Sequence, residues 1–123
     1  MMCGIGLLLA ASLLTPQESE LKAALPDIFA KSAAHYRALD AAATQLMKGA
    51  NGAVCFPRGY DAKRDALRMV SLNDWTNGHY AGALWYLYEC TGDDFFKERA
   101  TVWTEALEPN RHNSSHHDTG FIM

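Results

Sequence analysis

The segment NSSHHDTGF, residues 113–121, places two histidines directly before an aspartate. A carboxylate beside imidazole groups suits proton transfer, because neighbouring charges and burial set its pKa. A metal site is disfavoured, because ligand spacings such as H-x-x-x-H are absent from the segment. Asp118 could instead cap a following helix. The segment therefore predicts either acid–base chemistry at Asp118 or a purely structural cap.

A second segment, NDWTNGHYAG at residues 73–82, combines an aromatic ring with several hydrogen-bonding groups. Asp74 or Thr76 would cap the helix that follows. Capping does not explain Trp75, whose flat apolar ring beside polar groups is typical of sites that hold sugars. Packing of Trp75 in the core is the alternative. His79 lies at the entrance of the predicted helix and belongs to the same group of candidates.

Other chemistries lack support in the sequence. No glycine-rich phosphate loop, G-x-S-x-G elbow or C-x-x-C pair occurs. The net charge of −3 and the scattered Lys and Arg residues argue against a nucleic-acid partner. One disulfide between Cys55 and Cys90 is conceivable, although two small buried residues are the favoured interpretation.

The first residues of the chain have the character of a secretion signal. Residues 1–14 form an uncharged apolar run, shorter than the roughly 20 residues that span a bilayer. No basic residue precedes the run and no A-x-A site follows it, and a buried core helix is the alternative. We expect a signal-like segment at residues 1–16, a single domain at residues 17–123, no stable membrane anchor, and a periplasmic or secreted location.

Helical elements must position these segments. Apolar residues at steps of three and four predict a helix over residues 17–48, which Pro26 should split into a short helix and a longer one from residue 27. Residues 53–73 lose this period and predict a long loop with one or two short extended pieces. Helices over residues 78–90 and 94–107 should form a tight αα-hairpin.

The turn of this αα-hairpin also has a sequence signature. Gly92 suits the left-handed position after the first helix, and Asp93 suits the N-cap of the second. The first of these helices is apolar around most of its girth, so it should need neighbours on several sides. For that reason, and because residues 120–123 read as the start of another buried element, we expect the chain to be a truncated piece of a larger domain.

Four motifs in order resemble one enzyme family. The motifs are D-W-T-x-G, the L-W-Y-L-Y-E helix, T-G-D and H-D-x-G-F. With them, roughly residues 27–123 look like the amino-terminal part of the unsaturated glucuronyl hydrolases, glycoside hydrolase family 88. The resemblance implies an all-α fold whose αα-hairpins form the first part of an (α/α)6 toroid, incomplete in this chain. It also implies a catalytic domain that uses no cofactor.

The resemblance implies a reaction and its residues. The family releases a 4,5-unsaturated uronic acid from the non-reducing end of lyase-generated oligosaccharides of the glycosaminoglycan type, by hydration of the enol ether. By resemblance, Asp118 is a catalytic carboxylate, and His117 and Trp75 contact the substrate. The family's second carboxylate lies further along and is absent here, so the isolated chain is expected to be an inactive fragment.

The sequence departs from the family pattern at two places, and it also allows other interpretations. His79, Tyr80 and Ala81 stand where relatives often have two aromatic residues and a proline, and Thr119 stands where Leu or Met is common. A hydrolase of unsaturated rhamnogalacturonan products would share the fold and the chemistry. From another class, the chain could be a small helical carbohydrate-binding or protein-interaction module without catalysis. The oligomeric state is left open.

Overall fold

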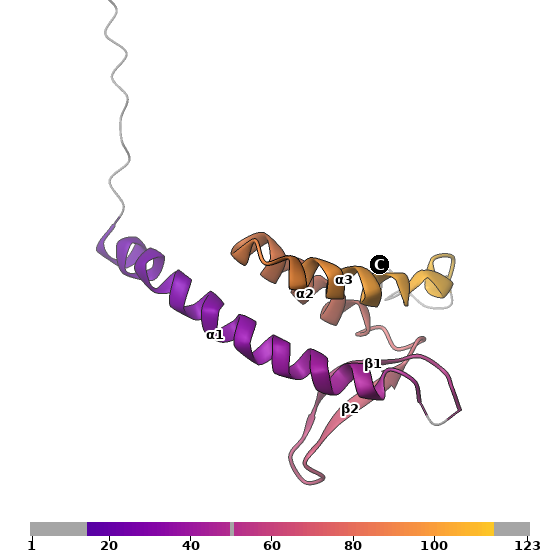
Figure 1. Ribbon diagram of the computed structural model, residues 1–123. Helices are drawn as coiled ribbons and strands as arrows, with labels where there is room; N and C mark the ends of the chain where they lie inside the picture. The colour runs from indigo at the N-terminus through magenta and orange to yellow at the C-terminus, as the bar shows by residue number, and fades with distance from the viewer. Residues whose placement is uncertain (1–14, 50, 115–123) are drawn as a thin grey trace, which may run out of the picture.

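The computed structural model describes residues 15–49 and 51–114, and within them three helices and one β-hairpin. Figure 1 shows α2 and α3 side by side above α1, with the strands beneath the carboxyl end of α1. The expected signal-like segment, apart from its last two residues, and the predicted site residues His117 and Asp118 lie outside the described residues. In chain order the elements are α1 (Pro16–Leu46), β1 (Cys55–Asp61), β2 (Ala66–Ser71), α2 (Gly78–Thr91), α3 (Asp94–Glu105) and the 3-10 turn η1 (Glu108–Asn110).

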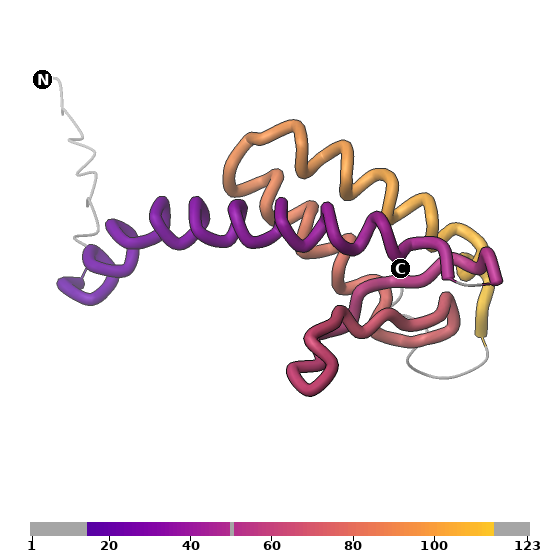
Figure 2. Tube along the Cα trace, turned by 60° about the horizontal axis from the view of Figure 1, so that its bottom comes forward, coloured from indigo at the N-terminus to yellow at the C-terminus, as the bar shows by residue number. Residues whose placement is uncertain are grey.

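Helix α1 is continuous through Pro26, so the predicted split at this residue is wrong. The helix begins with a capping box, in which Thr15 Oγ1 accepts from Glu18 N and Glu18 Oε2 accepts from Thr15 N. A proline inside a helix removes one backbone donor and bends the axis. Because Pro26 is exposed, water can hydrate the carbonyl that loses its partner. Figure 2 shows the first turns of α1 set at an angle to the rest.

Strands β1 and β2 pair antiparallel where the sequence predicted a loop with short extended pieces. The register shifts between Pro57, which pairs with Met69, and Gly59, which pairs with Arg68. Arg58 is therefore the extra residue of a bulge, a feature that bends a strand and re-aims a side chain. At this bulge, Arg58 Nη1 lies 2.9 Å from Asp74 Oδ2.

The αα-hairpin formed by α2 and α3 confirms both capping predictions. Gly92 adopts a left-handed conformation with φ of 67°, and its N–H donates to Tyr88 O at 2.8 Å. The Asp93 side chain accepts from Phe95 N at 3.1 Å and caps α3. The helix, turn and helix were therefore encoded by local signals.

The core lies where the carboxyl half of α1, the β-hairpin and the αα-hairpin meet. Trp103 of α3 is fully buried, with its ring centre 5.9 Å from that of Phe56 and 5.2 Å from that of Tyr80. On α2, Tyr86 is 71% exposed, and the described residues leave that side of the helix uncovered. The buried hydrophobic residues are Ala43, Phe56, Tyr80, Ala81, Leu84, Leu87, Phe96, Ala100, Trp103 and Leu107.

The helical fold class is confirmed, with a small two-stranded sheet added to it. One αα-hairpin beside a single long helix matches part of a helical toroid only loosely. Among the described helices, none combines the length and the apolar character needed to cross a membrane.

The two described cysteines are free thiols, and no disulfide joins them. Cys55 is half-buried at the start of β1, whereas Cys90 is exposed near the carboxyl end of α2. The prediction that both residues are buried is therefore wrong for Cys90, because the last turn of α2 lies outside the core.

Candidate binding site at the amino end of α2

The loop between β2 and α2 is organised by Asp74. Its Oδ1 atom accepts from the backbone N–H of Thr76 at 2.9 Å and from the Thr76 hydroxyl at 2.5 Å. Its Oδ2 atom accepts from Arg58 Nη1 at 2.9 Å, which ties the loop to the bulge of β1. The predicted helix cap at Asp74 or Thr76 is wrong, because Asn77 is the N-cap residue and no side chain caps α2.

The charge of Asp74 is stabilised within this loop. Partial burial alone would raise the pKa of its carboxyl group, but the hydrogen bonds from Thr76 and the nearby Arg58 guanidinium outweigh burial and lower that pKa. Asp74 is therefore an anion at neutral pH that orients Arg58, and it is unsuited to donate a proton there.

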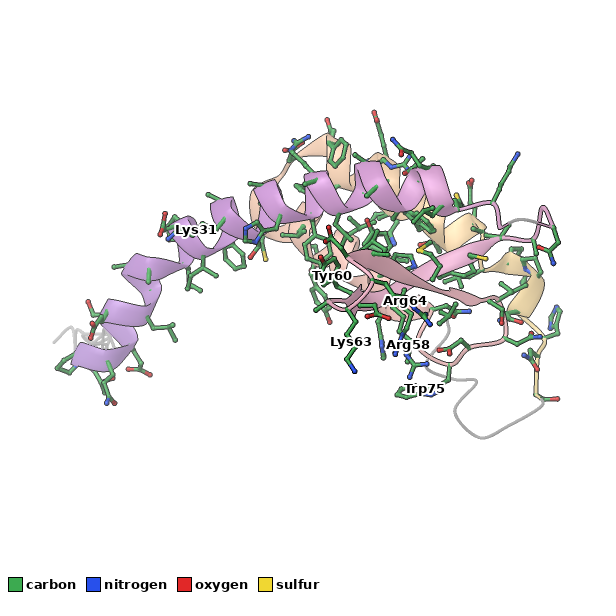
Figure 3. All side chains as sticks on the ribbon, turned by 90° about the horizontal axis from the view of Figure 1, so that it is seen from below. Lys31, Arg58, Tyr60, Lys63, Arg64 and Trp75 are labelled. Carbon is green, nitrogen blue, oxygen red and sulfur yellow. The ribbon has the colours of Figure 1, made fainter. Side chains whose placement is uncertain are left out.

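Trp75 is 43% exposed and lies outside the core, which excludes the core-packing alternative. Its ring meets that of His79 edge to face, with ring centres 5.9 Å apart and planes at 88°. In Figure 3, Trp75 and Arg58 extend from the same side of the molecule. Part of the Trp75 side chain thus faces solvent, and its contact with a substrate stays a prediction. By contrast, Trp85 is half-buried and donates through Nε1 to Thr104 Oγ1.

A pocket of about 430 Å³ opens beside this loop, between α1, the β-hairpin and the first turn of α2. Its volume is in the range of small-molecule sites. Aromatic and aliphatic side chains dominate its walls, and Arg58 supplies a positive charge. Such a combination suits a sugar ring that carries an acidic group. The lining residues are Tyr36, Leu39, Pro57, Arg58, Gly59, Tyr60, Leu67, Thr76, His79 and Tyr80.

A buried carboxylate, Asp40, supports the inner wall of the pocket. Its Oδ1 atom accepts from Tyr80 Oη at 3.1 Å and from Trp103 Nε1 at 2.8 Å. Its Oδ2 atom accepts from Arg99 Nε at 2.6 Å. Burial raises the pKa of the Tyr80 phenol, and the Asp40 carboxylate raises it further, so Tyr80 stays protonated and donates. The Tyr80 ring also stacks on Tyr36 at 6.0 Å.

Sequence analysis did not single out Asp40, Arg58 or Asn77. The signal for Asp40 was its place on the apolar stripe of α1, four residues after Tyr36 and three before Ala43. Arg58 had no local signal, since its position depends on strand pairing. Asn77 is buried, and its Nδ2 donates to Leu72 O, while no donor in the described part of the chain reaches its Oδ1 atom.

The structure places one of the three predicted site residues, Trp75, and brings it together with His79, Thr76 and Arg58. His117 and Asp118 lie outside the described residues, and their roles stay predictions. Within residues 15–49 and 51–114, no three His, Cys, Asp or Glu side chains gather closely enough to hold a metal ion.

Comparison with curated proteins found two relatives with one shared name. The unsaturated glucuronyl hydrolase of Formosa agariphila is 35% identical over 86 residues, which cover 70% of this chain and 22% of the relative. The unsaturated glucuronyl hydrolase of Bacillus sp. strain GL1 is 45% identical over 53 residues, which cover 40% of this chain and 14% of the relative. The chain thus spans less than a quarter of either relative. No family model and no solved structure matches the sequence.

Proposed function

We propose, from the confirmed resemblance of this chain to the unsaturated glucuronyl hydrolases of glycoside hydrolase family 88, that it is the amino-terminal part of such an enzyme. The substrate is an oligosaccharide of the glycosaminoglycan type that a lyase has left with a 4,5-unsaturated uronic acid at its non-reducing end. The products are a ring-opened 4-deoxy-5-keto uronic acid and the shortened partner sugar. The uncharged apolar run at residues 1–14 supports a periplasmic or secreted location, which we also propose.

The observation that carries this proposal is the 35% identity over 86 residues to an enzyme of that name. The site geometry supports it. A pocket with aromatic walls and one guanidinium lies beside an exposed tryptophan, Trp75. This tryptophan belongs to the D-W-T-x-G motif. These groups suit a flat unsaturated ring that bears a carboxylate.

In the proposed reaction, a carboxylic acid protonates C4 of the enol ether, and positive charge develops at C5 and the ring oxygen. Water adds at C5 and loses a proton, and the resulting hemiketal opens by cleavage of the bond between C5 and the ring oxygen. The hemiacetal that remains at C1 then collapses to an aldehyde and releases the partner sugar. Asp118 is one of the two carboxylates that this chemistry needs, and His117 and Trp75 contact the substrate.

The test follows the ultraviolet absorbance of the C4–C5 double bond in an unsaturated chondroitin disaccharide. The assay uses this chain and a longer chain that continues through the downstream reading frame. We expect no turnover by the short chain, turnover by the longer one, and its loss in Asp118→Asn. Lys31→Gln, on the exposed surface of α1, is the control and should keep full activity. A folded longer chain that leaves the absorbance unchanged would overturn the proposal.

One observation favours a second function, carbohydrate binding without catalysis. Trp75 is exposed beside a pocket of sugar size, an arrangement that needs no carboxylate to hold a ligand. This alternative predicts saccharide affinity that is unchanged in Asp118→Asn, and no turnover in any longer chain.

A further inference from the structure

The carbonyl oxygen of Leu72, at the start of the loop between β2 and α2, accepts two side-chain hydrogen bonds. Asn77 Nδ2 donates to it at 2.5 Å, and Asn110 Nδ2 of η1 donates to it as well. A carbonyl oxygen can only accept, and its two lone pairs suit two donors, so Leu72 O holds both amide groups with their nitrogen atoms toward it. We call this arrangement of Leu72, Asn77 and Asn110 the asparagine clamp.

Both asparagines of the clamp are buried. Asn77 is fully buried and Asn110 is only 3% exposed, although asparagine is mostly an exposed residue in proteins. Asn77 is also the N-cap residue of α2, where an asparagine side chain ordinarily accepts from a backbone N–H of the first helical turn. In the described structure, however, the Asn77 side chain makes no cap bond and turns back to Leu72 O. Asn77 therefore serves the loop before the helix.

The clamp closes the loop that carries Trp75. Leu72 and Asn77 stand at the two ends of this loop, so their hydrogen bond joins its base. Within the loop, Asp74 Oδ1 accepts from Thr76 N at 2.9 Å. A loop that is closed at its base and bonded within has few alternative conformations. The direction of the Trp75 side chain therefore depends on the clamp.

The clamp also joins this loop to the chain that enters residues 113–121. Asn110 O accepts from Asn113 N at 2.9 Å, and Asn110 Oδ1 accepts from Asn113 Nδ2 at 3.3 Å. The Asn110 amide thus donates to the Trp75 loop and accepts from the first residue of the segment that contains Asp118. Two predicted parts of the site, far apart in the sequence, are linked at one carbonyl group.

We propose that Asn77 and Asn110 are positioning residues, which fix the loop of Trp75 relative to the chain that leads to Asp118. This inference rests on the proposed function, in which Trp75 contacts the substrate and Asp118 is a catalytic carboxylate. Neither asparagine touches the substrate, and both act through the Leu72 carbonyl. A displacement of about 1 Å between reacting groups can lower a rate by roughly 100-fold, so the clamp should affect kcat more than KM.

The first test follows amide hydrogen exchange in the unmodified 123-residue chain. Segments that one clamp holds should open together, so residues 73–78 and 108–113 should show the same protection after correction for intrinsic exchange rates. Protection of residues 73–78 that is lower by more than about tenfold would show that the loop opens alone, and it would overturn the proposal.

The second test removes the Asn110 amide. Asn110→Leu keeps a side chain of similar shape and should raise the exchange rate of residues 73–78 by roughly tenfold or more. Phe96→Leu is the matched control, because Phe96 is fully buried at the opposite end of α3, below the Arg37 guanidinium. This control should raise exchange in all segments alike. Unchanged exchange of residues 73–78 in Asn110→Leu, or a loop-selective rise in the control, would overturn the proposal.

The two asparagines should act as a unit. Asn77→Leu should also raise the exchange rate of residues 73–78, and the double variant should exceed the stronger single variant only slightly, because both amides share one acceptor. Independent, fully additive effects would overturn the joint role. If Asn110→Leu does not fold, Asn110→Ala takes its place, and the exchange of the unmodified chain remains decisive.

Kinetics in the longer chain separate this proposal from the proposed function. Asn110→Leu should lower kcat by roughly 10- to 100-fold, with KM for the unsaturated chondroitin disaccharide changed by less than about threefold. Phe96→Leu should keep the original kcat at a temperature at which both variants are folded. An unchanged kcat in Asn110→Leu, or an equal loss in Phe96→Leu, would overturn the positioning role. If the unmodified longer chain gives no turnover, the proposed function fails, and hydrogen exchange still decides whether the clamp holds the loop.

Discussion

Asp40 and Asp74 are two of the four described aspartates that pair with an arginine, and their surroundings give them different roles. Asp40 pairs with Arg99 and has a side chain only 5% exposed, whereas Asp74 pairs with Arg58 and has a side chain 19% exposed. Asp40 lies behind the pocket wall, and Asp74 lies in the loop that carries Trp75. An aspartate–arginine ion pair therefore stabilises the fold when it is buried. Near the surface, the same pair orients a cation that a ligand can contact.

The partners of the two aspartates explain this difference. Donors to Asp40 come from α2 and α3, so the carboxylate of α1 joins three helices. Donors to Asp74 come from its own loop and the adjacent strand. A buried carboxylate that loses its hydrogen-bond donors cannot replace them with water. The same holds for buried donors that lose their carboxylate. The free energy of unfolding should therefore depend far more on Asp40 than on Asp74.

The largest effect is expected for Asp40→Ala. This change leaves the Arg99 guanidinium, the Tyr80 hydroxyl and the Trp103 N–H without their shared acceptor, and should lower the free energy of unfolding by about 3–5 kcal/mol. Urea denaturation followed by far-ultraviolet circular dichroism measures the loss. A decrease below about 1 kcal/mol, similar to that of an exposed ion pair, would contradict the structural role assigned to Asp40.

A smaller effect is expected for Asp74→Ala. The change removes an acceptor for Thr76 and Arg58, but water reaches these groups, so the free energy of unfolding should fall by about 1–2 kcal/mol. The loop and the Arg58 side chain should lose their fixed positions, and saccharide affinity should fall more than stability does. Urea denaturation followed by tryptophan fluorescence measures the stability, and titration with an unsaturated chondroitin disaccharide measures the affinity. Unchanged affinity would show that Arg58 needs no orientation by Asp74.

The contribution of Asp74 to the free energy of unfolding should depend on pH in the acidic range. Its folded-state pKa lies below the ordinary value of 3.8, so its contribution to stability is complete above that pH and is lost as pH falls through the lowered pKa. Asp74→Asn removes this group, so the stability difference between the original protein and the variant should shrink as pH drops below about 4. Urea midpoints measured at several acidic pH values test this, and a constant difference would refute it.

The smallest effect is expected at the exposed pair of Asp27 and Lys31, whose atoms lie 2.7 Å apart one turn from each other on α1. Both side chains are more than 70% exposed. Lys31→Gln should change the free energy of unfolding by about 0.5 kcal/mol or less, and high salt should erase the difference. This variant is the baseline for the two aspartates, and a loss above about 1 kcal/mol would weaken the contrast drawn between them.

Local signals allowed much of the fold to be predicted. Gly92 and Asp93 mark a turn whose geometry depends on neighbouring backbone groups alone, so the αα-hairpin was predicted with its caps. The break at Pro26 was predicted wrongly, because the sequence around this proline does not show that the residue is exposed and that the helix can bend there. The β-hairpin was missed as a paired element, since its stabilisation comes from pairing along the whole length of residues 55–71.

By itself, the sequence determined the helical periodicity, the turn between α2 and α3, the polar and aromatic character of residues 73–82, and the kinship with unsaturated glucuronyl hydrolases. Each of these depends on residue type and short spacing. Only the tertiary structure decided that Arg58 leaves the strand register to meet Asp74, that Asp40 joins three helices, and that Trp75 stays outside the core. These facts depend on contacts between residues 16 to 63 positions apart in the chain, which no local pattern records.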